Sequence, residues 1–415
     1  MSQPIRVLHF ADTHIGMENY GKTDPSTGLS SRVVDFLRRM DDMVQTARDE
    51  DVDLVIFAGD AFKTRSPNPT FQREFAWRIQ DLAEIAPVVL LVGNHDIPPN
   101  ALKASSIEIY DTLRVANVWV AHEYAIRRYE TKRGPIVVGA APYPIRSRLV
   151  GKMNTAGMTI ADIDEQLQHV LTNILEDLAQ QADEEAGADV PRLLTGHFTV
   201  SGAVWGSERS VMLGRDVQVL PSSLADPRWD YVALGHIHKH QCLTREHPPV
   251  VYSGSIERID FGEEGDPKGF VLAEVSRNET AWRFVELPAR PFVTLKADCR
   301  NTKSPTQDVL KLIKKHDLKD AVVRLQLQFT PQTESLYNEN TIREALRAAG
   351  VFHIAAMRRD VEHPERARLG GSPEGMTREE ILERFFISKQ VPPERREQLM
   401  QMAEDIFRTV DEKLS

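Results

Sequence analysis

Cysteine and long apolar segments are scarce in this chain of 415 residues. Only Cys242 and Cys299 are present, which excludes a disulfide framework and favours a reducing compartment. No apolar run is long enough to cross a bilayer, and the start of the sequence lacks the basic-then-apolar pattern of a signal peptide. The formal net charge of −10 argues against a generally basic nucleic-acid binder. Composition therefore predicts a globular protein of the cytoplasm.

The length and the uneven charge predict more than one domain. A chain of 415 residues exceeds the size at which a single core usually stops growing, so we expect two or three domains. Between positions 287 and 359, 13 Lys and Arg stand against 7 Asp and Glu. A basic module beside an acidic core is compatible with docking a polyanion, but a solvated surface explains this charge equally well.

Five short polar clusters each follow an apolar run. The runs have the length and composition of buried strands, so the clusters are expected at strand ends on one edge of a sheet. The runs are Val7 to Ala11, Leu54 to Ala58, Val88 to Val92, Arg192 to Thr195 and Tyr231 to Leu234. The clusters are Asp12-x-His14, Gly59-Asp60, Gly93-Asn94-His95-Asp96, Gly196-His197 and Gly235-His236-x-His238.

Helical stripes alternate with these strands, which predicts an α/β architecture for positions 1–286. The stripes cover Arg32 to Glu50, Thr70 to Ile85 and Ile163 to Leu178. The acidic, Ala- and Gly-rich segment from Gln180 to Val190 predicts an exposed connection. We place the first domain at 1–286.

Two further modules are predicted downstream of a linker at 287–291. Positions 287–365 are expected to form a small α+β domain with strands at 292–297, 323–329 and 351–357 and helices at 306–315 and 341–349. Positions 366–415 begin with a Gly370-Gly371-Ser372-Pro373 joint and continue as two amphipathic helices. The first of these has capping-box spacing between Thr377 and Glu380. The helices either pack on their own core or dock a partner protein.

The residue types in the clusters suit a pair of borderline metals such as Mn, Fe or Zn. Such a pair hydrolyses phosphate esters and needs a bridging carboxylate, which Asp60 is placed to supply. His95 is the candidate proton donor to the leaving alkoxide, and Asp96 the candidate group that orients it. The expected ligands are Asp12, His14 and His238 for one metal and Asn94, His197 and His236 for the other.

Each cluster alone has an ordinary structural explanation. Asn94-His95-Asp96 suits a tight turn, and Gly59-Asp60 after a strand is commonly a turn as well. A single Gly-His pair is more often a satisfied core histidine than a ligand. The five clusters in this order, each at a strand end, favour the metal site over those separate explanations.

The ordered clusters resemble the calcineurin-like metallophosphoesterases, whose pattern is D-x-H, G-D, G-N-H-[DE], G-H and G-H-x-H. More narrowly, the chain is similar to the SbcD family of DNA double-strand-break repair nucleases. Three segments carry that similarity: 11–16 (ADTHIG), 206–209 (GSER) and 252–258 (YSGSIER), the last continuing to Phe270. It covers about the first two-thirds of the chain strongly and the remainder only by layout.

The resemblance implies a calcineurin-like β-sandwich flanked by helices, followed by a DNA-capping domain and ATPase-binding helices. It implies a dimeric nuclease with two Mn²⁺ ions, although Mg²⁺ or another divalent metal is possible. The nuclease would act on DNA ends with an SMC-like ATPase of the SbcC type, in the cytoplasm and near the nucleoid. By motif, His95 acts on the scissile phosphate. The implied ligands are Asp12, His14, Asp60, Asn94, His197, His236 and His238.

Three basic residues are candidates for contact with substrate phosphate. Lys63 stands where family members commonly have an acidic residue or His, and it contacts phosphate, alters the balance of exonuclease and endonuclease activity, or is an exposed loop lysine. Arg258 and Lys268 lie in the loop after the last ligand pair, where ordinary surface charge is the alternative.

Three functions are compatible with these observations. The first is a DNA nuclease, an exonuclease on double-stranded ends and an endonuclease on single strands or hairpins. The second is a metallophosphodiesterase for small substrates, which has no need of the large downstream region. The third is a non-catalytic scaffold for DNA ends, which a missing ligand would favour. No ligand position is missing, so the nuclease is preferred.

Overall fold

The computed structural model describes residues 3–98, 103–151, 157–206, 216–362, 376–389 and 391–414. Within the GSER segment only Gly206 lies in these ranges, and the Gly370–Pro373 joint lies outside them. The chain divides into two compact units. One comprises Met1–Leu295, Ile313–Arg324 and Glu344–Ala356, and the other Lys296–Leu312, Leu325–Arg343 and Met357–Ser415. The predicted boundaries at 286 and 365 stay predictions.

The first of two six-stranded sheets has the order β14-β13-β1-β2-β3-β4. Strands β1 to β4 are parallel to one another, so β1, β2 and β3 end at the same edge of the sheet. Strand β13 pairs antiparallel with β1. The bounds are β1 Ile5–Phe10, β2 Leu54–Phe57, β3 Val88–Leu91, β4 Val118–Ala121, β13 Gly269–Ser276 and β14 Glu279–Glu286.

The second sheet has the order β11-β12-β10-β7-β6-β5, in which β7 and β10 are parallel neighbours. Apolar residues of both sheets, among them Ile56, Val89, Leu193 and Ala233, form one buried cluster, as expected for the inner layer of a sandwich. The predicted β-sandwich is therefore confirmed. The bounds are β5 Ala125–Thr131, β6 Gly134–Ala141, β7 Arg192–His197, β10 Tyr231–Gly235, β11 Gln241–Thr244 and β12 Val250–Tyr252.

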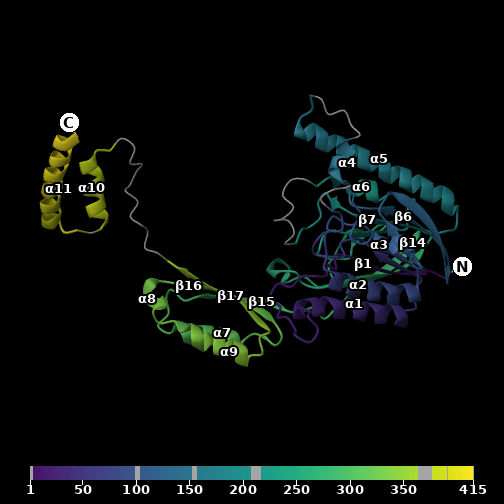
Figure 1. The fold of residues 1–415 in the computed structure, drawn as a ribbon, viewed down its shortest axis with the longest axis horizontal. Helices are drawn as coiled ribbons and strands as arrows, with labels where there is room; N and C mark the ends of the chain where they lie inside the picture. Colours follow the sequence, from purple (N-terminus) through teal and green to yellow (C-terminus); the bar gives the residue numbers. More distant parts are fainter. Residues whose placement is uncertain are drawn as a thin grey trace. The chain divides into compact units, whose positions relative to one another are not determined.

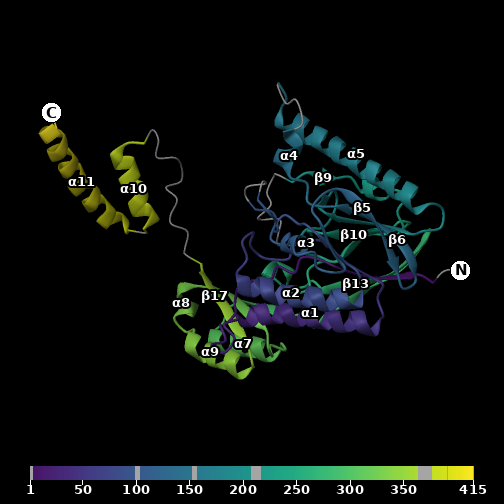
Figure 2. The same cartoon turned by 45° about the vertical axis from the view of Figure 1, so that its right-hand side comes forward.

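Helices cover both outer faces of the sandwich. Figure 1 and Figure 2 show α1 (Ser31–Asp49) and α2 (Pro69–Ile85) side by side on one face and α5 (Ile160–Ala186) on the other. The prediction of an exposed connection from Gln180 was wrong. Ala182 and Ala186 are buried in the outer core, so α5 continues until Gly187, whose φ of +70° ends it.

The remaining elements of the core are short. They are α3 Ile109–Thr112, α4 Arg146–Val150, β8 Thr199–Val200, β9 Gln218–Val219, α6 Pro221–Leu224 and the 3₁₀ helix η2 Phe261–Glu263. Several of them supply residues that surround the polar clusters at the strand ends.

Downstream of the sandwich, a three-stranded sheet has the order β15-β16-β17. Its elements are β15 Phe292–Asp298, α7 Pro305–Lys314, β16 Val322–Phe329, α8 Pro331–Glu334, α9 Glu339–Ala348 and β17 His353–Val361. Helices α10 (Arg378–Ser388) and α11 (Pro393–Leu414) follow, and Thr377 with Glu380 forms the predicted capping box. None of the described helices combines the length and apolar character that a membrane span requires.

Candidate metal centre

The polar clusters at the strand ends meet in the folded chain, and several of their residues have unusual backbone conformations. The φ angles are +53° at Asp12, +39° at His14, +64° at Asp60 and +102° at His236. Such angles are uncommon for residues with a β-carbon and gather at functional sites, where the surrounding structure holds them. Here main-chain hydrogen bonds hold two of the turns together, from Asp12 N to the Gly59 carbonyl and from His14 N to the Asp60 carbonyl.

The glycines of the clusters leave space for the polar side chains. Gly59 has a φ of +99°, and a β-carbon there would lie 2.4 Å from Nδ1 of His197. A β-carbon at Gly93 would lie 2.2 Å from Oδ1 of Asp60. Any larger residue at either position would displace a side chain of the site.

The first donor group contains Asp12, His14 and His238. The Nε2 atoms of His14 and His238 are 3.0 Å apart, and Nε2 of His14 is 4.0 Å from Oδ1 of Asp12. Nδ1 of His238 donates to Oε1 of Glu263 at 2.9 Å, which leaves its Nε2 free of a proton. Glu263 is in turn ion-paired with Lys268 at 2.8 Å.

The second donor group contains Asn94, His197 and His236. Oδ1 of Asn94 lies 3.0 Å from Nε2 of His197 and 3.0 Å from Nδ1 of His236. Nδ1 of His197 donates to the Ala58 carbonyl at 2.6 Å, so Nε2 is the ring atom that faces the donor group. Burial favours the neutral ring, but the Asp60 carboxylate outweighs it and raises the pKa of His197 to about 9, so metal binding would displace the proton on Nε2.

The outer nitrogen of His236 is held in the same way. Its Nε2 lies 3.1 Å from Oδ2 of Asp216 and 3.2 Å from Oγ1 of Thr199. A proton on Nε2 therefore leaves Nδ1 as the atom that faces the second donor group.

Asp60 lies between the two groups. Its Oδ1 is 3.4 Å from Nε2 of His197, and its Oδ2 is 3.7 Å from Nε2 of His14. Burial opposes ionisation of this carboxyl, but the neighbouring imidazoles of His197 and His95 outweigh it and hold its pKa well below its usual value. Asp60 is thus an ionised carboxylate with one oxygen turned to each group.

These donors fit a pair of divalent cations. Neighbouring ligands on bonds of about 2.1 Å lie about 3 Å apart. The His14–His238 contact and the contacts among Asn94, His197 and His236 have this spacing, whereas Asp12 is 4.0 Å from His14. Burial raises the pKa of Asp12 and lowers that of His14, so a bound cation would favour the charged carboxylate and the neutral ring together. Among the described residues, three overlapping triads have one donor atom from each member within 4.8 Å of the other two. They are Asp12–His14–His238, His14–Asp60–His95 and Asp12–Asp60–His197.

His95 is close to the first group, but it is held by a different residue from the one predicted. Its main-chain N–H donates to Oδ1 of Asp60, and its Nδ1 donates to the Lys63 carbonyl at 2.9 Å. The carboxylate of Asp96 instead accepts main-chain N–H groups of Asp60, Ala61 and Gly93. Asp96 therefore shapes the turns of the site, and the expectation that it orients His95 is corrected.

Two of the three expected phosphate contacts are also corrected. Lys268 is only 1% exposed, and its ammonium is held by Glu263, the His238 carbonyl and the Ser255 hydroxyl. The Arg258 guanidinium donates to main-chain carbonyls, two of them at Ala289 and Arg290. Both cations are occupied within the protein. Lys63 is half-buried beside His95, and its contact with phosphate stays a prediction.

Sequence reasoning missed Glu263 and Asp216, the two carboxylates that hold the outer nitrogens of His238 and His236. Asp216 also accepts the Tyr143 hydroxyl at 2.5 Å, and the Tyr143 ring lies 5.9 Å from the His236 ring. Neither carboxylate belongs to one of the five clusters. Only the general rule that a ligating imidazole binds an outer acceptor would have prompted a search for them.

Comparison with known proteins identifies relatives along most of the chain. A family model described as calcineurin-like phosphoesterase matches residues 5–240. The SbcD component of nuclease SbcCD from Bacillus subtilis (strain 168) is 28% identical over 303 residues, which cover 71% of this chain and 72% of that protein. The protein of the same name from Escherichia coli (strain K12) is 30% identical over 308 residues, with 71% of each chain covered. The one from Staphylococcus saprophyticus is 24% identical over 352 residues, 81% of this chain and 85% of that one.

Proposed function

The chain belongs to the SbcD family of calcineurin-like phosphoesterases, and we propose that it is a two-metal-dependent DNA nuclease. The observation that supports this most directly is the position of Asp60, which turns one oxygen to each of two donor groups. A phosphodiesterase that clamps the attacking and leaving oxygens needs such a shared carboxylate. The ligands we propose are Asp12, His14, Asp60, Asn94, His197, His236 and His238.

We propose manganese as the metal, with magnesium as an alternative. Bound divalent ions would supply activation of a water molecule and neutralisation of charge on the phosphate. The protein residues around them hold the imidazoles in one orientation and exclude bulk water from the donor groups. The Nδ1–H of His95 is held by the Lys63 carbonyl, which fixes the ring, and Nε2 would donate a proton to the leaving oxygen when the ring is the doubly protonated imidazolium.

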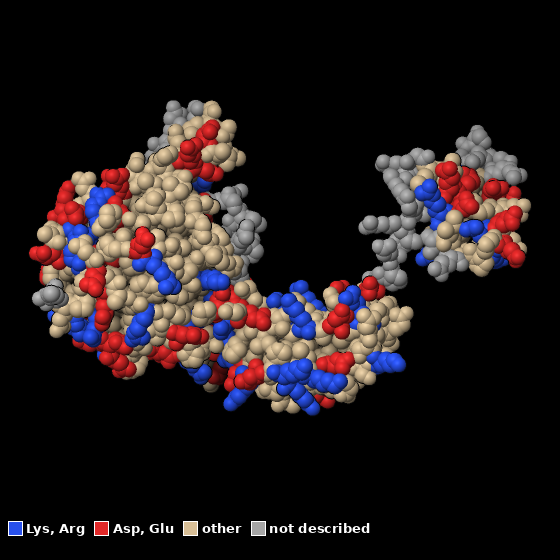
Figure 3. Space-filling view, turned by 180° about the vertical axis from the view of Figure 1, so that it is seen from behind, with Lys and Arg blue, Asp and Glu red and all other residues tan. Residues whose placement is uncertain are grey.

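The substrates we propose are DNA ends, cut as an exonuclease on duplexes and as an endonuclease on single strands or hairpins. Residues 287–365 would form the DNA-capping domain. Figure 3 shows Lys and Arg side chains gathered over the small α+β part, in agreement with the 13 basic residues between 287 and 359. Such a surface attracts the phosphate backbone without reading the base sequence.

Helices α10 and α11 are the proposed binding segment for an SMC-like ATPase of the SbcC type. Both expose large apolar side chains, Phe385 and Ile387 on α10 and Met402 and Ile406 on α11. Deletion of residues 377–415 should leave metal-dependent cleavage intact and abolish ATPase binding. Full capture of the ATPase by the truncated chain in a pull-down would contradict this.

We also propose a homodimer formed through α2 and α3. These helices and the residue after α3 expose Trp77 at 51%, Ile109 at 48% and Leu113 at 68%, which is unusual for side chains of this size. Light scattering of the full chain should give twice the chain mass, and Leu113→Asp should shift the equilibrium toward the monomer. A monomeric wild type at micromolar concentration would overturn the dimer.

The nuclease is tested with end-labelled duplex and hairpin DNA, in manganese, in magnesium and in chelator. We expect manganese-dependent cutting that is lost in both His95→Ala and His236→Ala. If DNA stays intact while a small phosphodiester is hydrolysed and the same variants abolish that hydrolysis, the protein is instead a small-substrate phosphodiesterase.

A further inference from the structure

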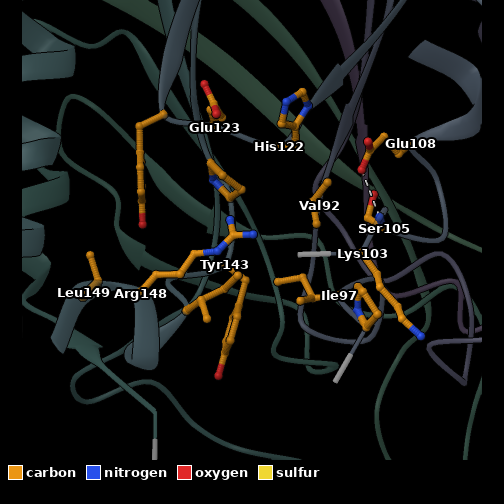
Figure 4. A pocket seen from close by; sticks show the side chains of 14 residues that line it. Val92, Ile97, Lys103, Ser105, Glu108, His122, Glu123, Tyr143, Arg148 and Leu149 are labelled. Carbon is orange, nitrogen blue, oxygen red and sulfur yellow. Dashed lines mark hydrogen bonds between the residues drawn. The ribbon is translucent and has the colours of Figure 1, made fainter. Parts of the chain in front are cut away.

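A pocket of about 420 Å³ lies beside the candidate metal centre and has no role in the function proposed so far. Its walls come from the segment after β3, the segment before α3, the end of β4 and helix α4. Figure 4 shows these side chains arranged around the cavity. The lining is mainly apolar and aromatic: Val92, Ile97, Tyr124, Tyr143, Ile145 and Leu149.

Tyr143 forms a wall shared by the pocket and the metal centre. Its ring lies 5.9 Å from the ring of His236 and 6.3 Å from that of His197. Its main-chain N–H donates to the carbonyl of Val92, the residue before Gly93 and Asn94. A group bound in the pocket would therefore contact the same tyrosine ring that packs beside two of the proposed ligands.

Two residues that line the pocket carry hydroxyls without a hydrogen-bond partner among the described residues. The Ser105 hydroxyl and the Tyr124 hydroxyl are both buried without a hydrogen bond. Buried hydroxyls normally have a partner, and an orphaned one needs an explanation such as a ligand. The lining also includes side chains of both charges: Arg148 and Lys103 are basic, and Glu108 and Glu123 are acidic.

This lining favours a neutral, flat and polar-edged ligand over a phosphate. Aromatic and apolar walls accept the face of a nucleobase, and scattered donors and acceptors suit its edge. In Figure 4 the Arg148 side chain reaches from α4 toward the middle of the cavity, where its planar guanidinium can stack on a base or donate to its carbonyl.

We propose that this pocket binds the nucleoside next to the scissile phosphate, with its base unpaired. The proposal rests on the nuclease function above and adds a requirement to it. A base inside a pocket of protein side chains cannot remain paired with the opposite strand, so the nucleotide at the cut must leave the duplex. The enzyme would thus favour ends that fray, hairpin loops and single strands.

Three chromogenic esters with the same leaving group separate pocket binding from metal chemistry. They are the 5′- and 3′-(p-nitrophenyl phosphate) esters of thymidine and bis(p-nitrophenyl) phosphate, which has no nucleoside. The pocket variants are Tyr124→Phe and Arg148→Ala. The matched controls are Tyr129→Phe, a half-buried tyrosine of β5, and Arg146→Ala, an α4 arginine ion-paired with Asp164, neither of which lines the pocket.

The quantity to compare is the ratio of kcat/KM for a thymidine ester to kcat/KM for the bis ester. For at least one thymidine ester this ratio should fall roughly fivefold in each pocket variant, because one hydrogen bond is lost. The controls should keep the wild-type ratio. Tyr124→Phe should fold normally, since the hydroxyl it removes has no hydrogen-bond partner among the described residues. An unchanged ratio for both thymidine esters in both pocket variants would overturn the proposal.

A second measurement needs no turnover. A single-stranded oligonucleotide with 5-iododeoxyuridine should photo-crosslink to the peptides that contain Tyr124 or Tyr143, and Arg148→Ala should reduce the yield. Crosslinks that map only to other peptides would overturn the pocket. If the wild type cuts none of the end-labelled DNA, the proposed nuclease fails, and the crosslinking result still decides whether the pocket binds a base.

Discussion

The imidazoles of His14 and His238 bring their Nε2 atoms to 3.0 Å of each other, although 224 positions separate the two residues in the chain. Two unprotonated ring nitrogens at this distance repel unless a proton or a cation lies between them. The sandwich holds them there because the turns after β1 and β10 meet, where the His236 N–H donates to the Asp12 carboxylate. The fold thus maintains an arrangement that metal binding would stabilise.

The Glu263 carboxylate fixes one of these rings, so Glu263→Gln should affect both stability and metal binding. It leaves the buried Lys268 ammonium without its counter-charge, which typically destabilises a protein by about 3–5 kcal/mol. Manganese affinity should fall roughly 10- to 100-fold, as for other outer partners of ligating histidines. Thermal unfolding and manganese titration measure the two effects.

The double variant Glu263→Gln with Lys268→Met is the control. It removes both buried charges, so much of the stability should return while manganese binding stays weak. Equal stability of Glu263→Gln and the wild type would contradict the assignment of Glu263 as the counter-charge of Lys268.

Asp216 should act on the second donor group as Glu263 does on the first. Asp216→Asn keeps the size of the side chain but removes the charge that holds Nε2 of His236. We expect a roughly 10- to 100-fold loss of manganese-dependent activity with little change in thermal stability, because Asp216 is only half-buried. Thr199→Val, which removes only the neutral partner, should cost less. A larger loss in Thr199→Val than in Asp216→Asn would reverse their assigned importance.

Substitutions of His95 and Asp96 should have different effects, although the two residues are neighbours in the sequence. His95→Gln should reduce cleavage by about 10²- to 10⁴-fold and leave metal content and folding unchanged, as expected for a proton donor. Asp96→Asn should instead lower stability, because the carboxylate accepts three main-chain N–H groups of the site. Metal content by mass spectrometry and thermal unfolding distinguish the two. Loss of bound metal in His95→Gln would make His95 a ligand.

The sandwich core should lose stability in acid through His9. Burial between the sheets lowers the pKa of His9 from 6.5 to about 3. Between these pH values the unfolded chain binds a proton that the folded chain does not. The free energy of unfolding therefore has its full value with respect to His9 above pH 6.5 and decreases as the pH falls. At pH 5 the loss is about 2 kcal/mol.

Urea unfolding at pH 8 and pH 5, with chelator present, measures this loss. His9→Gln lacks the titrating ring, so its stability should fall by about 2 kcal/mol less than that of the wild type over this range. Equal decreases in the two proteins would show that His9 does not titrate as its burial indicates.

The sequence allowed the strands and the donor residues to be predicted, because each cluster directly follows an apolar run. Roles that depend on distant partners were not predictable in this way. Lys268 and Arg258 were expected to face substrate or solvent, but Glu263 and the carbonyls at 289 and 290 hold them in the fold. Asp96 is adjacent to His95 in sequence, yet its carboxylate turns to the main chain of Asp60.

Calorimetric titration of the metal-free full chain with manganese tests the central claim that Asp60 is shared by two metals. We predict two ions per chain for the wild type. His14→Ala should remove one of them and Asn94→Ala the other, while Asp60→Asn should weaken both. A single ion in the wild type, or one site of full affinity in Asp60→Asn, would contradict the account.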